Sequence, residues 1–266
     1  MKKGFVSIYV LLLLLILSVS IAFISDQSEN NQEIKSSLLD KKQATYDAES
    51  SINLYLKEEK ESLLAYIDSD FDRDISTLSE EEIANLKEDI VYYKNNKRKI
   101  NLTRVKDFYR DDLKEANKKT YKVSNESVYK SSIGEARVYI SASINPVLLQ
   151  KEPISYNENK EYIDNLGINT YEVLDSKDFN KKKEYSPCVI VEGDMKLTKD
   201  ANIKGILIVK GKIDHNGKRL TVDGLLACNG YSQDKLSYTN DCEMFKDNIG
   251  NLDSKYSLQI ISKQAY

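Results

Sequence analysis

The hydrophobic positions of this chain begin with one uninterrupted run near its start. From Phe5 to Ile24 there is no charged residue, and three serines are the only small polar interruptions. An α-helix rises 1.5 Å per residue, so about 20 residues span roughly 30 Å, the thickness of a bilayer's hydrocarbon core. The pattern predicts a transmembrane helix over 5–24, preceded by a short leader at 1–4.

A helical pattern continues beyond the apolar run. Residues 25–67 contain neither glycine nor proline, and their apolar positions recur at three- and four-residue spacing: Ile34, Leu38, Ala44, Ala48, Ile52, Tyr55, Leu56, Leu63 and Ile67. This spacing predicts an amphipathic helix that continues the membrane helix. The two together would form one rod of about 60 residues, roughly 90 Å long.

The middle of the chain, residues 68–118, is predicted to hold an acidic loop and helices. After Gly4 the next glycine is Gly134, which favours helix until a changeover near residue 120. Ser79 and Glu82 form a capping-box pattern, which predicts a helix from Glu80 to about Tyr93.

Alternating aspartates before that helix have a second interpretation. Asp70, Asp72 and Asp74, with Glu81 at the twelfth place, follow the spacing of a calcium-binding loop. The sixth place is Ile75, where such loops need glycine for a sharp turn. An acidic loop before a capped helix is therefore the favoured interpretation, and the calcium site is a weak candidate.

Residues 119–185 are predicted to form strands followed by a polar surface excursion. Apolar and polar positions alternate from Glu135 to Ile144, which is typical of a half-buried strand. The polar stretch after Pro153 leaves room for one short helix near Glu161 to Leu166.

Regularly spaced glycines mark residues 186–232. The glycines at 205, 211, 217, 224 and 230 lie six or seven residues apart and separate short apolar runs. This spacing favours two or three coils of a parallel β-solenoid with glycine at the corners, capped at one end by the preceding strands or by the tail, 233–266. An antiparallel meander remains the alternative. The predicted fold class is α+β, with a long N-terminal helix and a β-rich C-terminal head.

The composition offers little catalytic chemistry. The chain has 266 residues, 30% of them charged, and a net charge of −3, with no sustained basic face, so we expect no nucleic-acid partner. His215, the single histidine, lies in a turn pattern and is expected to face solvent. The three cysteines allow at most one internal disulfide, for which Cys188 and Cys228 are the candidates, and they lack zinc-site spacing. We expect no metal, no cofactor and no enzymatic activity; a glycan-degrading solenoid would also need a carboxylate constellation that is missing.

Three interpretations compete for the N-terminus. Ser20-Ile21-Ala22 fits a signal-peptide cleavage site, although the apolar run is long for a signal. A plain signal anchor would hold Lys2 and Lys3 inside by the positive-inside rule. The third interpretation depends on Gly4-Phe5, because a short basic leader, then glycine and phenylalanine, then an immediate apolar helix is the layout of a type III signal.

The combination of Lys2-Lys3-Gly4-Phe5 with the segment from Ala44 to Asn53 resembles a minor pilin of a type IV pilus or a related filament. The resemblance covers roughly residues 1–56. It implies a prepilin peptidase that cuts between Gly4 and Phe5, a head outside the cytoplasmic membrane, and other pilins or pseudopilins as partners in a surface filament.

The chain departs from the family at Tyr9. Major pilins carry glutamate at this fifth mature position, thought to pair with the N-terminal amine of a neighbouring subunit. Members without it include the minor pseudopilin thought to cap type II secretion filaments, so Tyr9 implies a tip or initiation role. An alternative function is a membrane-tethered binding or adhesion protein that does not polymerise, with tyrosines such as Tyr231, Tyr238, Tyr256 and Tyr266 forming an adhesive surface.

Overall fold

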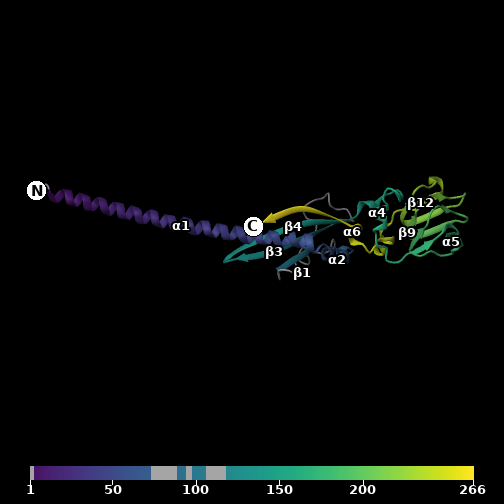
Figure 1. Ribbon diagram of the computed structural model, residues 1–266, viewed down its shortest axis with the longest axis horizontal. Helices are drawn as coiled ribbons and strands as arrows, with labels where there is room; N and C mark the ends of the chain where they lie inside the picture. Colours follow the sequence, from purple (N-terminus) through teal and green to yellow (C-terminus); the bar gives the residue numbers. More distant parts are fainter. Residues whose placement is uncertain (1–2, 73–88, 94–97, 106–117) are drawn as a thin grey trace.

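A computed structural model describes residues 3–72, 89–93, 98–105 and 118–266, with side chains for 8–72, 99–105 and 118–266. It has the α+β architecture expected from the sequence. A single long helix, α1 (Lys3–Glu58), projects from one end of an elongated β-rich head (Figure 1). The apolar part of α1 is long and hydrophobic enough to cross a membrane, with a mean hydropathy of 2.8 in its most apolar window.

The predicted helix over 25–67 is divided. The chain bends at Glu59, whose φ of −112° and ψ of 30° are not helical, and α2 (Lys60–Phe71) follows. Helix α2 runs past residue 67 because Leu63, Leu64, Ile67 and Phe71 form one buried stripe. The expected acidic loop therefore begins later than residue 68, and Asp68 and Asp70 are helical.

An antiparallel sheet of five strands forms the part of the head beside α1, and its order is β1-β2-β3-β4-β13. The strands are β1 (Asp89–Tyr93), β2 (Arg98–Val105), β3 (Lys118–Tyr129), β4 (Ser132–Ile144) and β13 (Tyr256–Ala265). Helix α1 packs on this sheet through fully buried Ala44, Ala48, Ile52 and Tyr55. Gly134 permits the close approach, since a Cβ there would lie 2.2 Å from the Thr45 nitrogen.

The predicted helix from Glu80 to about Tyr93 is wrong at its C-terminal end. Residues 89–93 are strand β1, in which Ile90 pairs with Asn101 and Tyr92 with Lys99 of β2. The sequence DIVYY is rich in β-branched and aromatic residues, which favour strands. Its pairing with β2 outweighs the helix preference that was inferred from the lack of glycine and proline. The changeover to strand thus comes well before residue 120, while the capping pattern at Ser79 and Glu82 lies outside the described residues.

The distal part of the head is a parallel β-solenoid, as the glycine spacing predicts. Every pairing among its strands is parallel. Cys188 pairs with Ile206, and Ile206 pairs with Leu225, so successive coils advance by 18 and 19 residues. The strands are β6 (Glu172–Leu174), β7 (Cys188–Val191), β8 (Met195–Lys196), β9 (Ala201–Val209), β10 (Ile213–Asp214), β11 (Leu220–Cys228) and β12 (Leu236–Thr239).

Two stacked glycines bend the longest solenoid strands. Gly205 in β9 and Gly224 in β11 have φ of 123° and 142°, a region that other residues rarely adopt. Gly224 lies directly on Gly205, and Gly205 lies on Pro187, so closely that a Cβ at position 224 would come within 1.9 Å of the Gly205 carbonyl oxygen. These corners lie inside strands, whereas the sequence alone suggested corners between them.

Aromatic side chains close both ends of the solenoid core. Phe179 of α5 (Ser176–Lys181) stacks on Tyr185 with ring centroids 4.6 Å apart at one end. Tyr231 and Tyr238 pack against the same core from the last coil. Solenoid ends need such caps because the final coil has no neighbour to cover it.

Short elements join the solenoid to the antiparallel sheet. They are η2 (Pro146–Leu149), β5 (Ile154–Ser155), α4 (Lys160–Asp164), η3 (Gln233–Lys235), η4 (Cys242–Met244), η5 (Lys246–Asn248) and α6 (Leu252–Lys255). Strand β5 adds to the solenoid beside β11, and α4 confirms the expected short helix. One hydrophobic core runs from α1 through this junction, and a second fills the solenoid.

Candidate functional site

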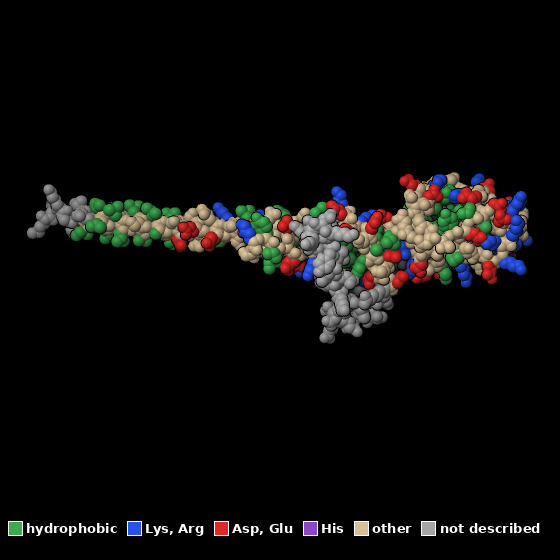
Figure 2. All heavy atoms as spheres, turned by 60° about the horizontal axis from the view of Figure 1, so that its bottom comes forward, with side chains coloured by type: hydrophobic (Ala, Val, Ile, Leu, Met, Phe, Trp, Pro, Cys, Tyr) green, Lys and Arg blue, Asp and Glu red, His purple; other side chains and the backbone are tan. Residues whose placement is uncertain are grey.

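The N-terminal half of α1 is bare. From Ile8 to Leu39 every residue is exposed, and Figure 2 shows an apolar sleeve along the N-terminal part of this stretch, before acidic and basic side chains appear. Tyr9 has 65% of its surface exposed and lies within the apolar part. Gly4 and Phe5 are in the first turns of the helix, which begins at Lys3, while Lys2 lies outside the described residues. An apolar helix surface of this length needs lipid or other protein around it.

A charged seam fixes the head to the consecutive helices α1 and α2. Asp68 of α2 forms an ion pair with Lys255 of α6 at 2.6 Å and accepts a hydrogen bond of 2.8 Å from the Tyr256 hydroxyl. The Lys255 side chain is only 6% exposed, so the pair lies at a covered contact. Burial of the Tyr256 ring, followed by its hydrogen bond to Asp68, raises the pKa of that hydroxyl.

The next two aspartates of the alternation also pair with cations. Arg104 of β2 lies 3.5 Å from the Asp70 carboxylate and donates a 3.0 Å hydrogen bond to its carbonyl. Lys246 of η5 pairs with Asp72 and Glu243. Burial of Lys246 opposes its charged form, but the hydrogen bonds to the two carboxylates outweigh that effect and raise its pKa.

These ion pairs occupy carboxylates that the candidate calcium site would need. Asp70 and Asp72, two of the four candidate ligands, are in ion pairs, and the other two, Asp74 and Glu81, lie outside the described residues. Within the part of the chain that is described, no group of three or more potential ligands comes together. The alternating aspartates join helix to head, a role that sequence reasoning missed because their partners are up to 188 residues away.

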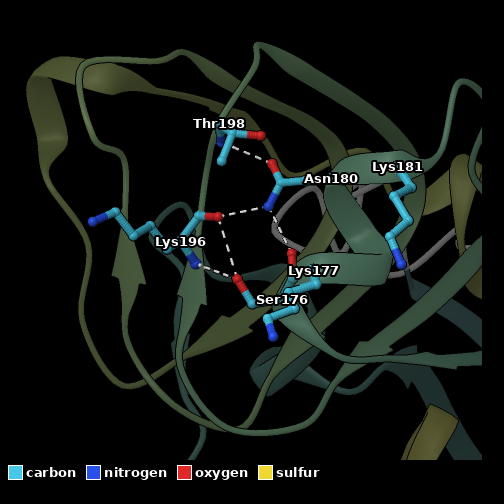
Figure 3. A pocket seen from close by; sticks show the side chains of 6 residues that line it. All are labelled: Ser176, Lys177, Asn180, Lys181, Lys196 and Thr198. Atoms are coloured by element: carbon cyan, nitrogen blue, oxygen red, sulfur yellow. Dashed lines mark hydrogen bonds between the residues drawn. The ribbon is translucent and has the colours of Figure 1, made fainter.

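A shallow pocket of about 400 Å³ lies beside α5, lined by Ser176, Lys177, Asn180, Lys181, Lys196 and Thr198 (Figure 3). Its hydrogen-bonding groups are used to complete the solenoid. The Ser176 hydroxyl accepts a 2.8 Å bond from the Lys196 backbone N–H, and the Asn180 amide accepts one of 2.7 Å from Thr198 and donates one of 2.7 Å to the Lys196 carbonyl. The side chains of Ser176 and Asn180 thus bond backbone groups that a further strand would otherwise bond. The pocket is therefore part of the cap at this end of the solenoid.

The candidate disulfide is not formed, and all three cysteines are free. Cys188 lies two strands and three positions away from Cys228 in the register, and the two side chains belong to different cores. Neighbouring strands are about 4.8 Å apart, so the separation exceeds the reach of a disulfide. Burial raises the pKa of the Cys188 thiol to about 11, which suits a core residue and not a nucleophile.

The expectation for His215 is also wrong. Its side chain is only 4% exposed, at the turn after β10, and among the described residues neither ring nitrogen has a hydrogen-bond partner. Burial lowers its pKa. The turn itself follows the pattern, with Asn216 and Gly217 at positive φ.

The tyrosines do not form one adhesive surface. Tyr231 and Tyr238 close the solenoid, and Tyr256 is buried against Asp68. Tyr266 lies at the opposite end of the head, where its carbonyl accepts a hydrogen bond from Thr45 of α1.

Comparisons of this chain with family models, with curated proteins and with solved structures gave no match. The features that bear on function are the bare apolar helix, the head packed on its far half and the residues at its start. Among the features described, the bare apolar helix is the one that needs lipid or another protein to cover it.

Proposed function

We propose that this chain is a minor pilin-like subunit of a type IV pilus or related filament. The observation that carries the proposal is a single helix that is apolar and bare in its first half and packed on the head in its second half. Such a rod serves as a membrane anchor before assembly and as a packing element afterwards.

The junction with the head supports this use of the helix. Ala44, Ala48, Ile52 and Tyr55 are fully buried against the sheet, and the seam at Asp68 ties the following helix to the head. No loop separates the apolar half of α1 from this packed half. A force on the anchor is therefore transmitted to the head, as a filament subunit requires.

The first residues suit processing by a prepilin peptidase. In this proposal Lys2 and Lys3 stay on the cytoplasmic side, the peptidase cuts between Gly4 and Phe5, and the head lies outside the cytoplasmic membrane. The chain is a substrate of an enzyme and not itself an enzyme. Other pilins or pseudopilins are its partners.

Tyr9 bears on the position of this subunit along the filament. The pilin resemblance puts glutamate at this position, so a subunit with tyrosine offers no carboxylate to the amine of a subunit above it. A buried carboxylate in hydrocarbon is retained only where it is paired. We therefore place the chain in the initiating group at or near the tip of the filament.

The test is N-terminal sequencing of the mature chain from cells that carry the wild type, Gly4→Val or Gly230→Val. Wild type and Gly230→Val should begin at Phe5, whereas Gly4→Val should keep its leader. Gly230 is a matched control, because the nearest atom to a Cβ there is 3.5 Å away. A wild-type chain beginning at Phe23 would be a cleaved secretory product. One that keeps Met1 would be a tethered protein that does not polymerise.

A further inference from the structure

The last coil of the solenoid, residues 229–240, is held at its two ends and is open on one side. The Asn229 amide donates a 2.8 Å hydrogen bond to the Lys210 carbonyl and accepts one of 2.8 Å from the Asn157 N–H. The Asn240 amide donates bonds of 2.9 and 2.7 Å to two backbone carbonyls beside η2. Between them β12 is the outermost strand of its sheet, and no described strand pairs with its free edge.

This coil is also shorter and less covered than those before it. Leu220 pairs with Leu236, 16 residues further on, whereas the earlier coils advance by 18 and 19 residues. Along β12, half-buried Leu236 and Tyr238 alternate with exposed Ser237 and Thr239. Segments with few buried contacts and an exposed backbone open locally at a small cost in free energy, so the coil is the part of the solenoid most ready to separate.

His215 lies in the coil that the last coil covers. On one side, the Ile213 N–H donates a 2.8 Å hydrogen bond to the Gly230 carbonyl of the last coil. On the other side, the Asp214 carbonyl accepts one of 2.9 Å from the Leu197 N–H. The histidine turn is therefore enclosed between two coils, of which only the last is free to move away.

The ring of His215 is an exception inside the solenoid. It is 4% exposed, and no other charged, amide or hydroxyl side chain of residues 172–239 is buried, a range that the structure describes throughout. Neither ring nitrogen has a hydrogen-bond partner among the described residues. A neutral ring tolerates this position, but a buried charge without a partner is costly.

We propose that residues 231–239 are an acid-sensitive flap: protonation of His215 releases them from the end of the solenoid, while Asn229 and Asn240 keep both ends of the flap attached. Release lets the charged ring reach water and uncovers Leu220 and Val222, which are fully buried in the closed coil. The distal end of the head thus changes from a closed surface to one with apolar side chains exposed. The inference goes beyond the proposed function and holds whether or not the chain joins a filament.

The surroundings of His215 set the direction of the effect. The charged groups that act on it come from neighbouring turns and are Asp214 of β10 with Asp234 and Lys235 of η3. Lys196, from the coil on the other side, pairs with Asp214 at 3.8 Å. Burial lowers the pKa of His215 and outweighs the Lys218 backbone and the two aspartates, which favour the charged ring. The open coil therefore binds the proton more readily, and the closed coil is favoured above about pH 6.5 and loses that advantage as the pH falls.

Hydrogen exchange of the full-length chain in detergent tests the flap. His215 is the single histidine, so no other side chain has its ordinary pKa between pH 5 and 7.5. Wild type is compared with His215→Leu at the same pH, which cancels the intrinsic pH dependence of exchange. From pH 7.5 to 5 the ratio of the two exchange rates at residues 231–239 should rise by up to about thirtyfold, the gain from protonating a released ring with a pKa of about 6.5. At pH 5 the β9 amides of the wild type should still exchange at least about tenfold more slowly than those of the flap.

A disulfide provides a second variant that leaves the histidine in place. Thr221 of β11 pairs with Ser237 of β12, and neighbouring strands are close enough for a disulfide. Oxidised Thr221→Cys/Ser237→Cys should hold the flap closed and remove its acid response, which reduction should restore. The matched control is Asn202→Cys/Thr221→Cys, which joins β9 to β11 at the same level and leaves the flap free, so its acid response should remain.

Three results would overturn the flap. The first is an equal acid response in wild type and His215→Leu, which would take the histidine out of the account. The second is equal exchange of the flap and of β9 at pH 5, which would mean that the whole solenoid unfolds and not its last coil. The third is an acid response that persists in oxidised Thr221→Cys/Ser237→Cys.

Discussion

At the scale of single residues, the head depends on cations that are unusual in their burial. Lys255 is covered by α2 and the start of β13, and its ammonium group finds the Asp68 carboxylate at 2.6 Å. Lysine is seldom buried unless it is paired, and removing one member of a covered pair leaves the other without its counter-charge.

Lys255→Met should therefore lower the free energy of unfolding of the head by about 2 kcal/mol. The control is Lys263→Met, which removes an exposed hydrogen bond to Asn53 and should cost less than about 0.5 kcal/mol. Urea denaturation followed by fluorescence measures both. Equal losses in the two variants would show that the seam does not brace the head.

His215 should make the solenoid sensitive to mild acid. Burial outweighs the attraction of Asp214 and Asp234, which together with Lys235 are the charged groups acting on it, and its pKa in the fold is lower than in the unfolded chain. The unfolded state then binds more protons, so the stabilisation is complete above about pH 6.5 and is lost as the pH falls below that value. Unfolding free energies at pH 7.5 and 5 should differ less in His215→Leu than in the wild type. An unchanged pH dependence would mean that this histidine is solvated in the fold.

At the scale of elements, the stacked glycines set the shape of each coil. Gly224→Ala would place a Cβ within 1.9 Å of the Gly205 carbonyl and hold alanine at a φ of 142°. The cost should be about 3 kcal/mol or more, from strain and displaced backbone. Gly230→Ala, whose Cβ would make only an ordinary contact of 3.5 Å with the Lys212 side chain, should be nearly neutral. Hydrogen exchange of the β9 and β11 amides distinguishes the two, and equal protection in both variants would be the contrary result.

The same elements show what a single sequence could predict. The regular glycine spacing favours a parallel solenoid over an antiparallel meander, because each coil repeats the local pattern of the one before, and the parallel pairing confirms this preference. Strand β1 was missed because it is stabilised by pairing with β2, which a local pattern does not show, and because the preceding capping pattern favours helix. The charged seam was missed for a similar reason. The sequence shows that Asp68 carries a charge, but no pattern near it indicates that its partner is Lys255. Long-range pairing is what a local pattern omits.

At the scale of the whole molecule, the chain has an anchor at one end and a solenoid at the other (Figure 1). The antiparallel sheet between them receives α1 on one face and takes the C-terminal strand β13 along its edge. The chain thus passes from the solenoid back to the sheet, which ties the distal coils to the helix. Such a molecule presents its solenoid at the far end of a rod.

The most direct measurement of the central claim is mass spectrometry of the N-terminal peptide of this chain, taken from filaments sheared off the cell surface. A processed filament subunit should be in the sheared fraction, and its first residue should be Phe5. A chain found only in the membrane fraction, or one that still begins with Met1, would contradict it.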